Sequence, residues 1–268
     1  MRKTRKLTIA VLGCATLFCS GYYMGGGGYL NRYGEQRMVL NITPPPVGSA
    51  EQQRDEKVFL KTRAYKDSAR WKQAINDANA TQTELIQSFG CATGYQLEPK
   101  NMPNFVKLFT TINDDVERLT RKSKKEFKVP RPYIAYGGAS CKTSAGYDYP
   151  SGHAMQGWTL ARLLVEFFPE RRVAIFAHAR SFAESRVICG VHSVSAVEVD
   201  EDYSEKLVNR LKKLPAFQDD LSNARSEMGK LEKRPDVNAK CEKFPAEYVK
   251  PFSIGMSLSR NYSANVVR

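Results

Sequence analysis

Residues 104–122 read NFVKLFTTINDDVERLTRK, and their periodicity is the strongest indication of fold class in the chain. The apolar residues recur at steps of four and three, at Phe105, Phe109, Ile112, Val116 and Leu119. Because an α-helix has about 3.6 residues per turn, this spacing gathers the apolar side chains on one face. The stretch therefore predicts an amphipathic helix.

The same periodicity occurs elsewhere in the chain. A second helix is predicted from apolar residues that stop before Pro169, namely Leu160, Leu163, Leu164, Phe167 and Phe168. A third is predicted from Phe217, Leu221, Ala224, Met228 and Leu231. Residues 58–89 predict two more helices, around Trp71 and Ile75. Since no convincing run of alternating strands and no internal repeat accompanies them, we predict an all-α fold, with a single compact helical domain over residues 47–231.

The composition narrows the class of protein. Of 268 residues, 42% are hydrophobic and 26% charged, which is too apolar for a disordered chain. Only residues 7–24 are apolar enough to enter a bilayer, which excludes a polytopic membrane protein. The 41 Lys and Arg against 28 Asp and Glu give a formal net charge of +13. This charge attracts phosphates, nucleic acids or anionic membranes, and it does not choose among them.

The N-terminus has the pattern of a bacterial export signal, predicted over residues 1–24. Four basic residues precede an apolar run over residues 7–19, and small residues follow it. The expected location is therefore periplasmic or secreted. Cleavage after the small residues, lipid attachment at Cys14 and an uncleaved membrane anchor all stay open. Residues 25–46 are expected to be a linker and extended entry segment, and residues 232–268 a C-terminal tail of unknown role.

The cysteines outside the export segment are Cys91, Cys141, Cys189 and Cys241. An even number in an exported chain indicates two disulfides, with three connectivities that the sequence does not separate. Four free thiols are the alternative. The chain has no Cys-x-x-Cys pair, so no structural zinc site is predicted.

Three short motifs combine rigid backbone residues with groups that bind or transfer phosphate. They are Lys124-x6-Arg131-Pro132, Pro150-Ser151-Gly152-His153 and Ser185-Arg186-x5-His192. Phosphoryl transfer depends mostly on positioning and on preorganised positive charge, because the transferred group spreads negative charge over its oxygens. Lys124, Arg131 and Arg186 supply such charge. Ser151 and Gly152 are expected at a helix N-terminus, where backbone N–H groups bind anions.

In this order and spacing, the motifs resemble the signature of the type 2 phosphatidic acid phosphatase superfamily. The closer resemblance is to the class A bacterial non-specific acid phosphatases, and it extends from residue 44 to residue 231. The superfamily also resembles vanadium-dependent haloperoxidases, but the motif spacing here favours the phosphatases. The resemblance implies a compact all-α fold and hydrolysis of phosphomonoesters, with no cofactor and no metal.

The resemblance also implies roles for individual residues. His192 attacks phosphorus as the nucleophile and forms a phosphohistidine, while His153 serves as general acid and then as general base. Imidazole suits both roles because its unperturbed pKa lies near neutrality. The residues implied to bind the phosphate are Lys124, Arg131, Ser151, Gly152 and Arg186.

The chain departs from the family pattern at one position. The pattern places an aspartate four residues after the nucleophilic histidine, and here that residue is Ala196. A carboxylate would fix the imidazole tautomer and stabilise its positive charge, which alanine cannot do. Glu198 and Asp200 follow in the sequence, but neither has the i+4 spacing from His192 that makes neighbours on a helix.

Two functions follow from these residues. The first is an exported acid phosphatase with broad specificity for phosphomonoesters, whose His192 is held by a substitute partner. The second is a weakened member of the family that binds phosphoesters. Retention of all three cations and both histidines favours the first. The expected partners are phosphomonoester substrates and not nucleic acid, membrane contact is expected only through an N-terminal anchor, and the oligomeric state stays open.

Overall fold

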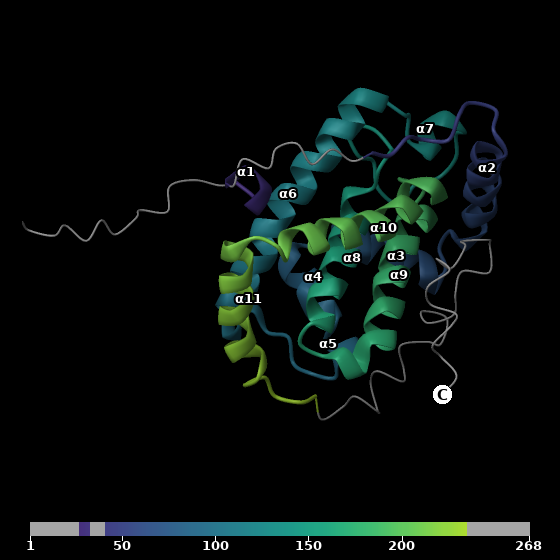
Figure 1. Cartoon of the computed structure of the whole chain (residues 1–268). Helices are drawn as coiled ribbons and strands as arrows, with labels where there is room; N and C mark the ends of the chain where they lie inside the picture. The colour runs from purple at the N-terminus through teal and green to yellow at the C-terminus, as the bar shows by residue number, and fades with distance from the viewer. Residues whose placement is uncertain (1–26, 33–40, 235–268) are drawn as a thin grey trace, which may run out of the picture.

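Helix α6 (Pro103–Phe127) is the longest helix of the computed structural model, which describes residues 27–32 and 41–234 (Figure 1). The five apolar residues predicted to share one face of this helix are all buried. The helix continues past the predicted end to Phe127. Lys128 then adopts a left-handed conformation with φ of 51°, and its N–H donates to the Lys124 carbonyl. A local cap, which the periodicity does not report, therefore sets the end of the helix.

The described residues contain helices and no β-strand, which confirms the predicted all-α fold. The other α-helices are α1 (Tyr29–Arg32), α2 (Ala50–Thr62), α3 (Ala69–Asn79), α4 (Gln82–Ser88), α5 (Gly90–Thr93), α7 (Pro132–Ala135), α8 (Gly152–Val165), α9 (Arg172–Ile188), α10 (Val194–Leu211) and α11 (Pro215–Met228). Single 3₁₀ turns occur at Arg63–Tyr65, Pro99–Asn101 and Pro169–Arg171. In this part of the chain, the only β-type contact is an isolated bridge between Tyr95 and Lys233.

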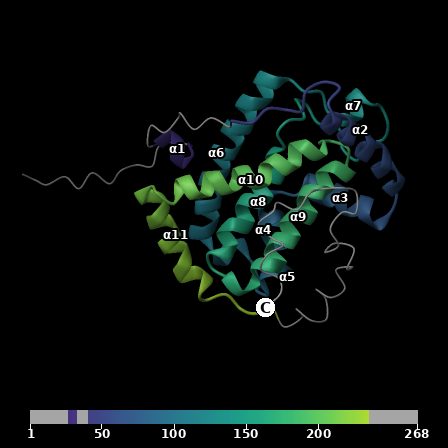
Figure 2. The ribbon, with the colours of Figure 1, turned by 45° about the vertical axis from the view of Figure 1, so that its right-hand side comes forward.

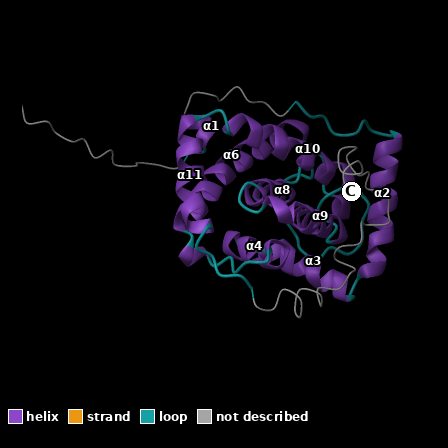
Figure 3. Cartoon of the chain, turned by 60° about the horizontal axis from the view of Figure 1, so that its bottom comes forward, coloured by secondary structure: helices purple, strands orange, loops and turns teal. Residues whose placement is uncertain are grey.

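Helix α8 lies at the centre of the molecule. Figure 3 shows α8 and α9 side by side, with the longer helices arranged around them. Helix α8 buries apolar side chains around its whole circumference, including Met155, Trp158, Leu160 and Leu164. A helix that is apolar all round is stable only in a core. The N-terminus of α8, which begins at Gly152 within the second motif, is therefore held in place by packing.

Residues 58–89 differ from the prediction of two helices. They contain the end of α2 and the whole of α3 and α4, and both Trp71 and Ile75 lie on α3. Side-chain caps divide the region, because Ser68 Oγ accepts from the Trp71 N–H and Thr81 begins α4 with a capping box. The spacing of apolar residues alone does not locate such caps, so it did not separate α3 from α4.

Two predicted helices also end earlier than their apolar pattern. Helix α8 ends at Val165 and α11 ends at Met228. Phe167, Phe168 and Leu231 pack against the core from the segments that follow. Apolar residues beyond a helix end are buried for the same reason as those within it, so the pattern overestimates the length.

The N-terminal described segment is anchored to the helical core. Tyr29 and Leu30 of α1 are fully buried, although they lie within the segment expected to be a linker. The Tyr29 hydroxyl donates to Asp220 Oδ2 at 2.6 Å, and the Leu30 N–H donates to Asp115 Oδ2 at 3.1 Å. Figures 1 and 2 show α1 beside α6.

The predicted export signal and most of the predicted C-terminal tail lie outside the described residues. Among the residues that are described, no helix is both long and apolar enough to cross a membrane. Figures 1 and 2 place α2 and α7 at the same end of the molecule, and the Phe59 ring of α2 packs 5.8 Å from the ring of Tyr136, which ends α7. The motif residues lie at helix ends and in the loops between them: Lys124 is near the end of α6, His153 at the start of α8 and Arg186 near the end of α9.

Replacing Gly157 by alanine should destabilise the fold. A Cβ at this position would lie 2.7 Å from Cδ1 of the buried Phe182 ring, so α8 and α9 would have to separate. We expect a loss of about 1–3 kcal/mol in the free energy of unfolding, measured by urea denaturation. Gly229→Ala is the matched control, because that residue has φ of −69° and a Cβ there would have its nearest neighbour at 3.7 Å. Equal midpoints for Gly157→Ala and wild type would contradict the close packing.

Candidate active site

The Ser151–Gly152 step begins α8 in the way that the sequence predicts for a helix N-terminus. Ser151 is the N-cap, and its Oγ accepts from the Ala154 N–H at 3.4 Å. The Ser151 N–H donates to both Asp200 Oδ2 and the Ala196 carbonyl, each at 3.1 Å. These bonds tie the start of α8 to α10. A Cβ at Gly152 would meet Thr120 Oγ1 only at ordinary contact distance, so the packing of the protein does not itself require glycine there.

His192 lies in the short connection between α9 and α10 and is buried. Gly190, with φ of 78°, turns the chain out of α9. A Cβ at Gly190 would lie 2.7 Å from an Arg63 nitrogen, so glycine is needed both for the turn and for the space. The His192 N–H then donates to the Arg186 carbonyl at 3.3 Å. The third motif thus spans the end of α9, where the backbone turns back and His192 hydrogen-bonds the Arg186 carbonyl.

Two neighbours fix the proton on the His192 ring. Arg131 Nη1 lies 3.1 Å from Nε2, and Asp148 Oδ1 lies 3.0 Å from Nδ1. A guanidinium can only donate, so Nε2 must accept and carries no proton. The ring proton is therefore on Nδ1, where Asp148 accepts it. This tautomer leaves the Nε2 lone pair directed towards Arg131.

Asp148 belongs to none of the three motifs. Its Oδ1 also accepts from the Ser193 N–H at 3.0 Å, and Ser193 is the N-cap of α10. Burial raises the pKa of Asp148 to about 6, against the opposing effects of the Ser193 hydrogen bonds and of Lys124. The carboxyl group thus links the His192 ring to the start of α10.

The carboxyl groups considered from the sequence have other partners. Ala196 is fully buried in the first turn of α10. Glu198 pairs with Arg54 at 2.6 Å, and Asp200 accepts from the Ser151 N–H. These bonds join Glu198 and Asp200 to residues other than His192.

Lys124 lies in the last turn of α6. Its ammonium group donates to the carbonyls of Tyr147 and Asp148. Burial, together with the charge of Arg131, lowers the pKa of Lys124 to about 8, against the opposing effects of Asp148 and Asp200. The lysine is thus held against the loop that precedes the second motif.

The two arginines of the motifs differ in how well they are satisfied. Arg131 donates to the carbonyls of Val191 at 2.8 Å and Ala145 at 3.1 Å. Arg186 is 2% exposed, and its Nε and Nη1 have no hydrogen-bond partner. Burial lowers the pKa of Arg186 to about 10, and Arg131 adds to that effect. A buried guanidinium with unused donors beside a second cation is arranged to receive an anion.

His153 is the second residue of α8 and faces this positive cluster. Burial lowers its pKa to about 3, and the cations Arg186, Lys142, Lys124 and Arg131 each contribute in that order. His153 is therefore neutral in the empty site. Lys124, Arg131 and Arg186 also lower the pKa of His192, so three cations act on both rings.

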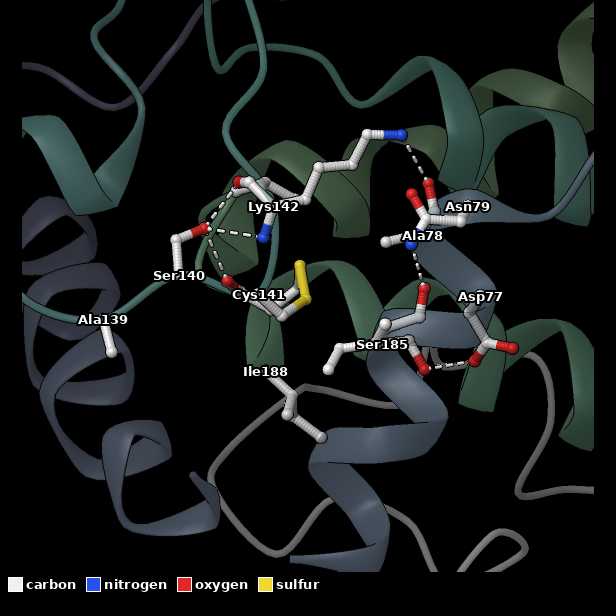
Figure 4. Close-up of a disulfide and its surroundings, with 12 residues drawn as sticks. Asp77, Ala78, Asn79, Ala139, Ser140, Cys141, Lys142, Ser185 and Ile188 are labelled. Carbon is white, nitrogen blue, oxygen red and sulfur yellow. Dashed lines mark hydrogen bonds between the residues drawn. A yellow bond between two sulfur atoms is a disulfide. The ribbon is translucent and has the colours of Figure 1, made fainter. Parts of the chain in front are cut away.

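A disulfide closes one side of the site. Cys141, in the loop after α7, is bonded to Cys189 at the end of α9 (Figure 4). The Cys141 N–H also donates to the Cys189 carbonyl at 3.0 Å. This disulfide establishes one cysteine pair, which the three connectivities allowed by the sequence had left open. Cys91 is disulfide-bonded as well, and Cys241 lies outside the described residues.

Figure 4 also shows how the third motif is supported from α3. Ser185 Oγ donates to Asp77, as the figure shows. Arg70 Nη1 in turn donates to Ser185 Oγ at 2.8 Å. Lys142 Nζ reaches the carbonyl of Ala78 at 3.0 Å. The serine of the motif thus has a structural contact with α3, next to the buried Arg186.

Comparison with known proteins identifies the family. A model of the PAP2 superfamily matches residues 105–199, which contain all three motifs. A non-specific acid phosphatase from Providencia stuartii is 34% identical over 203 residues, covering 73% of this chain and 82% of that protein. The chain belongs to the non-specific acid phosphatases of the PAP2 superfamily. It is therefore a phosphomonoesterase, a hydrolase of phosphate monoesters.

Two further proteins are similar to this chain. A non-specific acid phosphatase of Salmonella typhimurium is 32% identical over 196 residues, covering 69% of this chain and 78% of that protein. The crystal structure of a transmembrane PAP2 type phosphatidylglycerolphosphate phosphatase from Bacillus subtilis aligns with a TM-score of 0.45 and 19% identity. That alignment covers 60% of this chain and 84% of the other.

Two residues near the site of this acid phosphatase were not predicted from the sequence: Asp148, which contacts His192, and Lys142, whose charge acts on His153. Both lie in the loop between α7 and α8, where no periodicity applies. The only available signal for Asp148 was its position directly before the Tyr149–Pro150 step that leads into the second motif. Within the described ranges, no group of three or more His, Cys, Asp or Glu side chains is arranged to hold a metal ion.

Sulfate should bind this acid phosphatase more tightly as the pH falls. In the empty site His153 is neutral, because burial and the surrounding cations lower its pKa to about 3. A bound dianion offsets those cations and raises that pKa. Binding then takes up a proton, so the dissociation constant should fall from about pH 7 to about pH 5. Calorimetry in buffers of different ionisation enthalpy measures the proton uptake.

Two histidine variants locate that proton. His153→Gln should weaken the pH dependence of sulfate binding. His178→Gln should keep it, because His178 lies on α9, hydrogen-bonds Ser88 at 2.9 Å and has its pKa lowered by burial alone. An unchanged pH dependence in His153→Gln would show that the proton goes elsewhere.

Proposed function

We propose that this acid phosphatase is exported and hydrolyses a broad range of phosphomonoesters, without a metal ion, through a phosphohistidine at His192. The observation that carries the proposal is the neutral Nε2 of His192 among cations that include the buried Arg186 with two unused donors. An anion that accepts from these donors has its phosphorus placed next to a nitrogen lone pair. Such an arrangement favours in-line attack.

The phosphate is held by charge and by backbone. Four cations lower the pKa of His153, namely Arg186, Lys142, Lys124 and Arg131. The start of α8 adds the Ser151 hydroxyl and the Gly152 N–H group, where the helix dipole favours an anion. These fixed groups supply the positive charge that metal ions supply in other phosphatases.

The first step transfers the phosphoryl group to the enzyme. The Nε2 lone pair of His192 forms a bond to phosphorus while the bond from phosphorus to the alcohol oxygen breaks. The leaving oxygen takes the proton of His153, which the bound substrate anion has caused to be protonated. The products of this step are a free alcohol, a neutral His153 and a phosphorylated His192.

The second step releases phosphate. Neutral His153 takes a proton from a water molecule, whose oxygen bonds to phosphorus while the nitrogen–phosphorus bond breaks. Inorganic phosphate leaves, His153 gives up its proton in the emptied site, and the next ester to bind causes His153 to be protonated again. Because His153 must be protonated when the ester binds, the proposal accounts for activity at acidic pH.

Two features support export. The sequence has the pattern of an export signal over residues 1–24. The Cys141–Cys189 disulfide is of a kind that persists in oxidising compartments such as the periplasm. Broad specificity is supported by the relatives that are named non-specific acid phosphatases.

The test of the proposed mechanism is covalent trapping. Wild-type enzyme should hydrolyse an aryl phosphate at about pH 5–7, and His192→Ala should lose at least about 10³-fold in kcat, because the nucleophile is absent. Rapid quenching in alkali after mixing with a ³²P-labelled ester should leave label on His192. Treatment with a chelator should not change the rate.

His178→Ala is the control for loss of a buried histidine, since that ring contacts Ser88 and Phe89 and no motif residue. It should retain both turnover and labelling. Turnover by wild type with His192 unlabelled would contradict the phosphohistidine route.

A further inference from the structure

The position that carries an orienting aspartate in the family pattern is Ala196 in this chain, and a different carboxylate contacts the nucleophile. We propose that Asp148 is the positioning residue of His192, so that this role lies in the loop before α8 instead of on α10. The inference rests on the proposed function, in which His192 attacks phosphorus.

Asp148 holds the ring and the backbone together. One oxygen, Oδ1, accepts from His192 Nδ1 and from the Ser193 N–H, each at 3.0 Å. Ser193 begins α10, whose N-terminal dipole favours a carboxylate at this point. A group that accepts from two successive residues fixes the ring relative to the chain that carries it.

The other nearby carboxyls are engaged elsewhere. Asp55 accepts from the Ser195 N–H at 3.0 Å and from the Ser195 hydroxyl. Asp200 accepts from the Ser151 N–H, and Glu198 pairs with Arg54. Among the carboxylates of the described residues, Asp148 is the one that hydrogen-bonds His192.

Asp148 matters most when His192 becomes positive. Attack by Nε2 turns the imidazole into a cation, next to Lys124, Arg131 and Arg186, which already repel positive charge on it. A carboxylate that accepts the Nδ1 hydrogen offsets this repulsion at the point of contact. The Nε and Nη1 donors of Arg186 have no hydrogen-bond partner, so the contact between Asp148 and His192 leaves both of them unused.

Asp148→Asn tests the inference. The amide NH₂ can donate to Nδ1, which would move the ring proton to Nε2, against Arg131 and in the path of attack. We expect kcat to fall at least about 10²-fold; a comparable change in a serine protease triad costs about 10⁴-fold. Because the Asp148 carboxylate accepts from His192 and Ser193 and is not one of the proposed phosphate-binding groups, KM and the sulfate dissociation constant should stay within about threefold of wild type.

Asp55→Asn is the matched control. Asp55 is likewise a buried carboxylate that accepts a backbone N–H in the first turn of α10, and it does not contact His192. It should keep kcat within about fivefold of wild type. A similar loss in both variants would show that the effect comes from capping α10 and would overturn the inference.

Ala196→Asp gives an independent test. If Asp148 already holds His192, a second carboxylate at position 196 should give no gain in kcat. A strong gain would show that His192 lacks a partner in wild type. The inference would also be overturned if Asp148→Asn kept wild-type kcat, or if it lost sulfate binding as strongly as turnover. Failure of the proposed function is distinguishable, since wild type itself would then leave His192 unlabelled.

Discussion

The active site depends on how one imidazole is held. His192 lies between Arg131, which can only donate, and Asp148, which accepts, and together they allow a single neutral tautomer. That tautomer directs a lone pair from Nε2 towards the cluster of cations. The lone pair can attack phosphorus once a bound phosphate accepts the Arg131 donor in place of Nε2, so the proton position that the two contacts set comes before every later step.

The rest of the fold keeps these contacts in a buried, positively charged place. Helix α8 is apolar all round, which fixes its N-terminus, and the Cys141–Cys189 bond joins the loop of Asp148 to the end of α9. Buried cations such as Arg186 cost stability when no anion is present, as the lowered pKa values of Arg186 and Lys124 indicate. A bound phosphate therefore relieves a repulsion that the empty protein maintains, and ligand binding should stabilise the fold.

The sequence was informative where the structure is local. A helical period predicted α6 and its buried face, and the motif Pro150-Ser151-Gly152-His153 correctly indicated the start of a helix. Helix ends that are set by caps, such as the end of α6 at Lys128, were predicted less accurately, because the conformation of a single residue ends the helix independently of the apolar spacing. The His192–Asp148 contact joins residues 44 positions apart across a loop, so neither spacing nor periodicity could report it. Glu198 and Asp200 are close to His192 in sequence, but they bond to Arg54 and to the Ser151 N–H. The partner of His192 comes instead from the loop before α8.

The most direct test of the central claim is the protonation of the His192 ring, measured by ¹⁵N NMR of the ligand-free enzyme at about pH 7. The account predicts a neutral ring with its proton on Nδ1, and a hydrogen-bonded Nδ1–H signal that disappears in Asp148→Asn. A proton on Nε2 in the wild-type enzyme, or an Nδ1–H signal unaffected by that substitution, would contradict it.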